Sequence, residues 1–502
     1  MKISEYRHYD AMGLAEVLQK GDAKPDELMA CALALATSAK QTHNAITFLD
    51  PEVATEANKE TTLRGVFGAT PFLLKDSALA STILPTSLGS RLLDGVKYDH
   101  DATLLRRFID AGLRPFARTT VPEICMAPTT EALRNNGPTL NPFDVRRSSG
   151  GSSGGAAVAV ALGVVPIAHG SDGGGSIRIP SACCGVFGLK PSRGRLPTGP
   201  ARGETWAGLA TDGVLSRTVR DTAAALDAVS GWASGEPYAA PPQERSFLAA
   251  ALATEPSERL RVGVLRQAWN SIPVSDECWS SVEHAAILCK EIGHEIADAG
   301  LPAVDFDAFI CAHTTIMCAQ VVVAVDARLK VLGRTLRDDD LEASIWDAYQ
   351  RGRDLKAPDY VRAIAVMHST GRAMAAALEQ VDVLLTPTIT RLPSFLGEFS
   401  MNTSFDEFRH KVSRYGTFMS VVNASGQPAA SLPLRWTNEG LPVAVQFVGR
   451  FGREDTLIQL AAELERRVPW DVHYKSLWAA TSVAPNSSSQ ISPQSDQPVR
   501  SR

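Results

Sequence analysis

Apolar residues in this chain follow two patterns that alternate along most of its length. Short uninterrupted apolar runs, as in residues 69–74, 164–168, 260–265 and 381–385, predict buried strands. Stretches with apolar residues at helical spacing, as in residues 101–112, 217–229, 281–292 and 455–467, predict amphipathic helices. This alternation favours an α/β fold in which a mostly parallel, mixed sheet is covered by helices.

The same patterns predict one large domain over residues 1–480, because no segment there has the composition of a linker. Residues 305–375 are rich in helical patterns and poor in strand signals, which indicates a helical cap or insertion. From residue 481 to residue 502 the chain is polar and rich in serine and proline. That composition predicts a disordered C-terminal tail.

Composition narrows the class of protein. The chain has 502 residues, of which 44% are hydrophobic and 21% charged, with a net charge of −5, as expected of a soluble globular protein. Lysine and arginine are spread along the sequence, so a nucleic-acid partner is not expected. The longest apolar run, about 13 residues, is short for a membrane span. The eight cysteines form no CxxC pair, which favours reduced thiols and a cytoplasmic location.

Two loops rich in glycine and serine carry the strongest chemical signal. They are GGSSGG at residues 150–155 and GSDGGGS at residues 170–176, on either side of an apolar run. A flexible linker fits this arrangement badly, because linkers are polar on both sides. Glycine allows the backbone to lie bare against a ligand, so backbone N–H groups and hydroxyls can converge on one reacting atom. The loops therefore predict an active site.

Other motifs are incomplete. Residues 150–154 match G-x-S-x-G, the nucleophile elbow of α/β-hydrolases, but a polar loop precedes them where that motif needs a buried strand. Neither glycine cluster is followed by Lys-Ser/Thr, as a phosphate-binding P-loop requires. His294 and Glu295 begin like H-E-x-x-H, but the second histidine is missing. The sequence therefore predicts neither a metal site nor a cofactor.

A family resemblance accounts for the two loops together. Residues 150–195 resemble the amidase signature, including two serines 24 positions apart. PFLLKD at residues 71–76 resembles the lysine motif of that family, and NASGQP at residues 423–428 resembles a later landmark. The likeness covers nearly the whole chain apart from the tail. Ala-His-Gly at residues 168–170 is similar to the branch that includes the 6-aminohexanoate cyclic dimer hydrolases.

The resemblance implies a catalytic set of Lys75, Ser152 and Ser176. In the family Ser176 would be the nucleophile, Ser152 a bridging serine after a cis peptide bond, and Lys75 the group that finally takes the proton. A serine hydroxyl needs a base to become nucleophilic, and a buried lysine can be that base if it stays neutral enough near the working pH. The N–H groups of Gly173, Gly174 and Gly175, with that of Ser176, are the candidate oxyanion hole.

Neighbouring residues are interpreted as support. The resemblance gives Asp172 and Arg178 a bracing role, and Ser153 is expected to bond to the backbone, as is Ser171. Asp76 either orients the lysine or caps the next segment. A histidine at position 169 tempts a Ser-His-Asp interpretation, but a lone histidine at a strand end more often packs or hydrogen-bonds.

Three residues are candidates for the substrate pocket. Cys125 and Met126 occupy the place of a family loop that borders the acyl group, and Met317 lies in the expected cap. Ordinary core packing explains sulfur-bearing side chains equally well.

The sequence thus predicts a serine hydrolase that cleaves the carbon–nitrogen bond of a small neutral amide through an acyl-enzyme. Anilides, linear or cyclic amides and carbamates are the candidate substrates, and a homodimer is compatible with the sequence. Three alternatives remain: the glutaminase subunit of an amidotransferase, a catalytically inactive binding protein and an α/β-hydrolase esterase. Labelling by a serine-directed reagent separates two of them from the amidase, because the esterase would be labelled at Ser152 or Ser153 and the inactive protein would not be labelled at Ser176. Fast hydrolysis of aryl amides by the purified chain, without hydrolysis of glutamine, would exclude the glutaminase.

Overall fold

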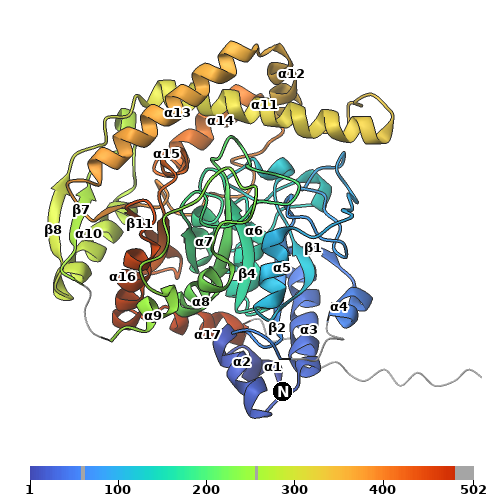
Figure 1. Ribbon diagram of the computed structural model, residues 1–502, viewed down its shortest axis with the longest axis vertical. Helices are drawn as coiled ribbons and strands as arrows, with labels where there is room; N and C mark the ends of the chain where they lie inside the picture. Colours follow the sequence, from blue (N-terminus) through green and yellow to red (C-terminus); the bar gives the residue numbers. More distant parts are fainter. Residues whose placement is uncertain (58–62, 255–257, 481–502) are drawn as a thin grey trace, which may run out of the picture.

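The computed structural model describes residues 1–57, 63–254 and 258–480, so the predicted tail lies outside the described residues. Its centre is an eleven-stranded sheet in the order β1-β3-β2-β4-β6-β5-β10-β11-β9-β7-β8 (Figure 1). The strands are β1 (Ile46–Leu49), β2 (Thr70–Lys75), β3 (Leu113–Thr119), β4 (Ile167–Asp172), β5 (Phe187–Lys190), β6 (Thr211–Ser216), β7 (Arg261–Leu265), β8 (Glu295–Ala299), β9 (Val383–Pro387), β10 (Ala429–Trp436) and β11 (Pro442–Gly449). The α/β class predicted from the alternating pattern is confirmed.

The sheet is mixed, but parallel pairing is less extensive than predicted. Four neighbouring pairs are parallel, namely β2–β3, β2–β4, β7–β8 and β7–β9. The other six are antiparallel and include every pair from β4 across to β9. The expectation of a mostly parallel sheet was wrong because β5, β6, β10 and β11 were not recognised as strands. Strands β10 and β11 return on each other through a short loop, which only antiparallel strands can do.

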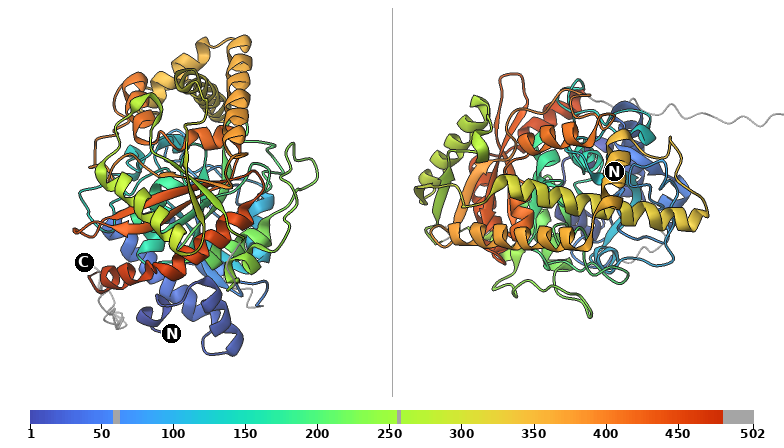
Figure 2. Two further views of the ribbon diagram at one scale, coloured as in Figure 1. Left: turned by 90° about the vertical axis from the view of Figure 1, so that its left-hand side faces the viewer. Right: turned by 90° about the horizontal axis from the view of Figure 1, so that it is seen from above.

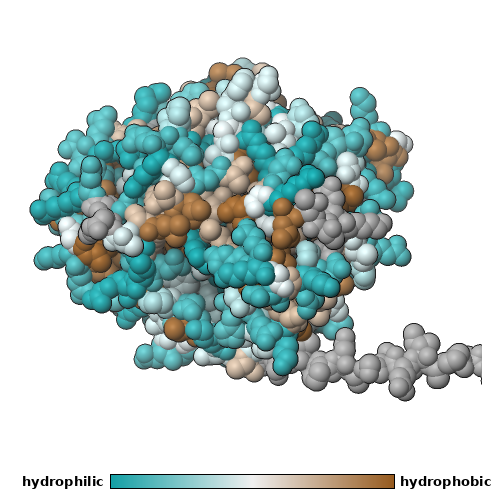
Figure 3. Space-filling view, turned by 60° about the horizontal axis from the view of Figure 1, so that its bottom comes forward, coloured by the Kyte–Doolittle hydropathy of each residue, from teal (hydrophilic) through white to brown (hydrophobic). Residues whose placement is uncertain are grey.

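Helices surround this sheet (Figures 1 and 2). Those that pack directly on strands include α3, α6, α7, α8, α10 and α16. The helices are α1 (Ile3–Tyr6), α2 (Ala11–Lys20), α3 (Pro25–His43), α4 (Pro51–Ala57), α5 (Thr103–Asp110), α6 (Gly154–Ala161), α7 (Arg178–Cys184), α8 (Val219–Val229), α9 (Phe247–Leu252), α10 (Asp276–Glu291), α11 (Phe306–Leu332), α12 (Ala343–Asp354), α13 (Ala357–Ala377), α14 (Phe405–Tyr415), α15 (Ser420–Ser425), α16 (Glu454–Arg467) and α17 (Asp471–Ala480). The face shown in Figure 3 is largely hydrophilic, with apolar residues in small separate groups.

Helices α11, α12 and α13 form a cap over one end of the sheet, where the sequence placed a helical cap or insertion (Figures 1 and 2). Within the described ranges, α11 is the one helix long and apolar enough to cross a membrane by length and composition. Its most apolar window is 44% buried in the molecule. The helix packs against α12 and α13 and contributes side chains to the cavity that contains Ser176, which accounts for its buried apolar residues, whereas Val323 and Val331 are exposed.

The order of strands in the sheet places the lysine motif beside the second glycine loop. Strands β2 and β4 are parallel neighbours, with Leu73 paired to Ala168. Parallel strands end at the same edge of a sheet, so the lysine that ends β2 lies beside the start of the second glycine loop, at the end of β4. Helix α6 begins at Gly154, directly after the first glycine loop.

Candidate active site

The lysine and the first serine of the predicted set are in direct contact. Lys75 Nζ donates a hydrogen bond to Ser152 Oγ at 2.7 Å. It also donates to the carbonyl of Ser171 at 3.1 Å and to its hydroxyl at 3.0 Å. Lys75 and Ser152 are both fully buried. Burial lowers the pKa of Lys75 below its ordinary value of 10.5, although the negative charge of Asp172 opposes this shift.

The two glycine loops are joined beside Ser152. The backbone N–H of Ser153 donates to the carbonyl of Ser176 at 3.2 Å, and Ser152 and Ser176 line the same cavity. The peptide bond between Gly151 and Ser152 is cis, as the resemblance implied. A Cβ at Gly151 would lie 2.2 Å from the carbonyl oxygen of Thr129, which explains the glycine. In the part of the chain that the structure describes, the Ser176 hydroxyl makes no hydrogen bond, so it is free to meet a ligand.

Asp172 and Arg178 brace the second loop through a fully buried ion pair. Arg178 Nη2 donates to Asp172 Oδ1 at 2.9 Å, and Nε donates to Oδ2 at 2.9 Å. The remaining donors of Arg178 reach Gln446 at 2.6 Å, Asn423 at 2.7 Å and the carbonyl of Met419 at 3.2 Å. Burial by itself would raise the pKa of Asp172, but the guanidinium and Asn423 hold that pKa far below its usual range. Neither Asn423 nor Gln446 was assigned this role from the sequence.

The candidate oxyanion hole needs one correction. The N–H of Gly175 donates to Asp172 Oδ1 at 2.7 Å, so it is already engaged in holding the loop. Across the described residues, the N–H groups of Gly173, Gly174 and Ser176 have no such partner, and these three remain the candidate donors. Gly175 serves the loop in a different way. Its φ is +116°, and a Cβ at this position would lie 2.8 Å from Met419 Cγ, so both the backbone and the space demand glycine.

Two ambiguous residues near the lysine have clear roles in the structure. His169 is buried, and its Nδ1 accepts a hydrogen bond from the backbone N–H of Lys75 at 3.2 Å. Its Nε2 then carries the proton and faces Asp212 Oδ1 at 3.1 Å. His169 therefore positions the lysine backbone and is not part of a Ser-His-Asp triad. Asp76 accepts from the backbone N–H of Ser87 at 2.8 Å, so it holds the next segment and does not bond to the lysine amine.

The two supporting serines lie close together and differ in their contacts. Ser153 Oγ lies 3.4 Å from both the N–H and the carbonyl of Ser171, so it bonds to backbone, as expected. Ser171 contributes more than expected, because both of its oxygens accept hydrogen bonds from Lys75.

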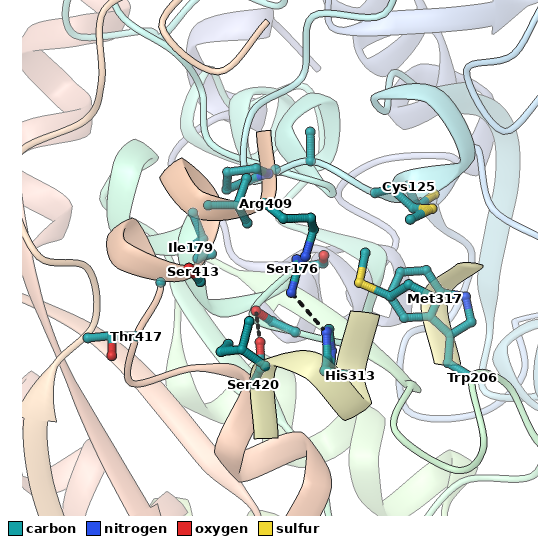
Figure 4. A pocket seen from close by; sticks show the side chains of 18 of the residues that line it. Cys125, Ser176, Ile179, Trp206, His313, Met317, Arg409, Ser413, Thr417 and Ser420 are labelled. Carbon is teal, nitrogen blue, oxygen red and sulfur yellow. Dashed lines mark hydrogen bonds between the residues drawn. The ribbon is translucent and has the colours of Figure 1, made fainter. Parts of the chain in front are cut away.

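The cavity above Ser176 has two lobes. The smaller lobe, of about 50 Å³, is lined by residues that include Ser176, Ile179, Phe309, His313, Met317 and Arg409. The larger lobe, of about 200 Å³, is lined by residues that include Ser152, Ser171, Ser176, Glu204, Trp206 and Asp212. Cys125 and Met126 line both lobes, and Met317 lines the smaller one, so the three predicted pocket residues do face the cavity. Cys125 and Met317 are labelled in Figure 4.

Two polar residues of the smaller lobe were missed by the sequence analysis. Arg409 Nη2 donates to His313 Nδ1 at 3.2 Å, and both side chains are buried (Figure 4). Burial and the neighbouring guanidinium lower the pKa of His313 to about 3, although the Gly173 backbone raises it slightly. The histidine is therefore neutral. A signal existed in the sequence. Arg409 follows Phe405 by four positions and His313 follows Phe309 by four, so each polar residue lies on the apolar face of its helix.

Comparison with known proteins gives a consistent result. A family model described as Amidase matches residues 27–458. The 6-aminohexanoate-cyclic-dimer hydrolase of Pseudomonas sp. (strain NK87) is 34% identical over 492 residues, which covers 92% of this chain and 95% of that enzyme. A relative of the same name from Paenarthrobacter ureafaciens is also 34% identical over 492 residues.

Solved structures agree with these matches. The structure of a 6-aminohexanoate cyclic dimer hydrolase complexed with substrate has a TM-score of 0.87 at 32% identity, covering 94% of this chain and 99% of that one. A bacterial aryl acylamidase of the amidase signature family shares the fold, with a TM-score of 0.83 at 24% identity, over 94% of this chain and 98% of that one.

A buried lysine against one serine, a second serine on the same cavity and the backbone N–H groups of the second glycine loop can supply the base, the nucleophile and the oxyanion hole of a serine hydrolase, so the site and the α/β fold point to that class. The family model and the relatives make the assignment more specific. The chain belongs to the amidase signature family and is a hydrolase that acts on carbon–nitrogen amide bonds.

Proposed function

We propose that Ser176 attacks the carbonyl carbon of a small amide and forms an acyl-enzyme. Its proton passes to Ser152 as the Ser152 proton moves to Lys75. The observation that carries this assignment is the contact of 2.7 Å between the buried Lys75 amine and the Ser152 hydroxyl. A neutral amine in that position can take a proton, and burial favours the neutral form.

The second half of the reaction uses the same groups. The N–H groups of Gly173, Gly174 and Ser176 hold the oxyanion of the tetrahedral intermediate. When the carbon–nitrogen bond breaks, the proton returns from Lys75 through Ser152 to the leaving nitrogen, and the amine departs. A water molecule then loses a proton to the same relay and attacks the ester carbonyl. The acid is released, and Ser176 regains its hydroxyl proton.

The comparison with the relatives favours small linear or cyclic amides as the substrates of this chain. The relatives at 34% identity are named for hydrolysis of the cyclic dimer of 6-aminohexanoate. A cavity of two lobes that meet at Ser176 suits an amide with a group on each side of the scissile bond. Carbamates and anilides present the same kind of carbonyl to the same groups.

Active-site labelling and a set of variants test the proposal together. A fluorophosphonate should label Ser176, found by peptide mapping, and Ser176→Ala should abolish both labelling and hydrolysis of aryl amides. Lys75→Met should reduce both strongly. Ser413→Ala is the matched control, because Ser413 lines the smaller lobe outside the relay. Labelling at Ser152 or Ser153 would overturn the assignment, and rapid glutamine hydrolysis without aryl-amide hydrolysis would favour a glutaminase subunit.

A further inference from the structure

The position of Ser152 indicates which half of the substrate each lobe holds. It lines the larger lobe, whereas Ser176 lines both. In the proposed reaction Ser152 returns the proton to the leaving nitrogen, so that nitrogen must lie on the side of Ser152. The amine half of the substrate therefore occupies the larger lobe, and the acyl half occupies the smaller lobe.

The smaller lobe contains a buried positive charge without an acidic partner. Arg409 is 7% exposed, and none of the ion pairs among the described residues includes it. The nearest carboxylates on its own helix are engaged elsewhere, since Asp406 pairs with Arg351 and Glu407 pairs with Lys411. Burial lowers the pKa of Arg409 to about 10, which leaves the guanidinium charged at neutral pH. A buried, unpaired charge is costly, and a bound anion would offset that cost.

The guanidinium also has donors to spare. It carries five N–H groups, and in the described structure they make two hydrogen bonds, from Nη2 to His313 and from Nε to Thr314 Oγ1 at 3.4 Å. A guanidinium cannot accept, so His313 Nδ1 is the acceptor and His313 Nε2 carries the proton. That Nε2 is buried and has no well-formed hydrogen bond among the described residues. Figure 4 shows both side chains turned toward the cavity that contains Ser176.

We propose that Arg409 binds a carboxylate at the far end of the acyl group, so that the preferred substrates are monoamides of short dicarboxylic acids. This inference rests on the proposed function. The guanidinium fork matches a carboxylate in geometry and charge. The smaller lobe, of about 50 Å³, is much smaller than the larger lobe, of about 200 Å³, which favours a short acyl chain. The proposal departs from the neutral substrate expected from the sequence, where Arg409 had not been singled out.

A matched pair of substrates tests the charge. The mono-p-nitroanilide of succinic acid carries the carboxylate, and its methyl ester carries the same chain without the charge. The wild-type enzyme should hydrolyse the acid with a kcat/KM at least tenfold above that of the ester. Succinate should also inhibit hydrolysis of the ester competitively, and butyramide at the same concentration should inhibit it much less.

A variant tests the residue. Arg409→Gln should lower the ratio of the two kcat/KM values from at least tenfold to about one, because the carboxylate of the substrate loses its cationic partner. Arg414→Gln removes the same charge from an exposed position of the same helix and should leave the ratio unchanged. If Arg409→Gln does not fold, Arg409→Lys keeps the charge but loses the fork, and the succinate inhibition of the wild type still decides the question.

The outcomes separate this inference from the function beneath it. Equal hydrolysis of acid and ester, with Ser176 labelled normally, would overturn the carboxylate site and leave the amidase assignment intact. A preference for 4-butyramidobenzoate over butyranilide, without a preference for the succinyl acid, would move the anion to the amine half and overturn the proposal as stated. Failure to hydrolyse any of these amides, with no labelling of Ser176, would overturn the proposed function as well.

Discussion

The buried ion pair between Asp172 and Arg178 allows the loss of folding stability in a variant to be predicted as a number. Asp172→Asn keeps the shape of the side chain and removes its charge, while Arg178 stays fully buried. If the amide oxygen takes the place of Oδ1 and accepts from Gly175, the amide nitrogen faces the N–H of Ile177 and the guanidinium, which are donors. Breaking a buried pair in this way costs about 3–5 kcal/mol.

That cost should appear as a shift in melting temperature. Unfolding entropy is about 2.1 cal/mol/K per residue, so about 480 folded residues give roughly 1 kcal/mol per degree, and the variant should melt about 3–5 °C lower. Differential scanning calorimetry at pH 7 and a fixed scan rate measures the shift. Activity should fall as well, because the amide nitrogen cannot accept from the N–H of Ile177, the residue that follows Ser176 in the loop.

An exposed pair supplies the control. Asp406→Asn makes the same chemical change in a pair whose acid is 76% exposed, and it should change stability by less than about 1 kcal/mol. Adding Arg178→Met to Asp172→Asn should recover part of the lost stability, because it removes the unpaired charge. Equal melting temperatures for Asp172→Asn and the wild type would refute the view that this pair braces the loop.

Three further predictions concern the lysine, the loop and a buried acid. Burial lowers the pKa of Lys75, and the neutral amine is the catalytic form, so kcat/KM should rise with pH in a range below 10.5. Lys75→Met should lower kcat about 10²–10⁴-fold. A flat pH profile, with chemistry rate-limiting, would contradict this role of the lysine. Gly175→Ala places a Cβ 2.8 Å from Ile179 and should lower both stability and activity. Gly440→Ala is the control, because Gly440 also has a positive φ but lies in open space, and its free energy of unfolding should fall by only about 1 kcal/mol. Urea unfolding measures both changes. Burial raises the pKa of Glu123 to about 8, so this residue lowers stability as pH rises from about 4.5 to about 8; Glu123→Gln should flatten that dependence in urea titrations, and an unchanged slope would show that Glu123 is ionised in the folded protein.

The local patterns predicted the elements that approach the site, but not the whole sheet. Helix α5 and strands β2, β7 and β9 fall where apolar spacing placed them, within a few residues. Strand β4 continues past its apolar run through the polar residues His169, Ser171 and Asp172, and strands β5 and β6 also contain polar and glycine residues. Such strands lack a local signal, because pairing within the sheet and cover from both sides stabilise them more than their own composition does.

The sequence alone was enough to propose Lys75, Ser152, Ser176 and the glycine loops as the active site, because motif spacing and chain order record the chemistry that the family shares. Only the tertiary structure decided which groups the donors of this site bond to. The N–H of Gly175 donates to Asp172, the Lys75 amine donates to Ser171, and the backbone N–H of Lys75 donates to His169. The tertiary structure also selected Arg409, and not the neighbouring Arg414, for the cavity. Helical spacing from Phe405 places Arg409 on the apolar face of α14, but only the packing of that helix against the cap makes it a buried charge on the cavity that contains Ser176.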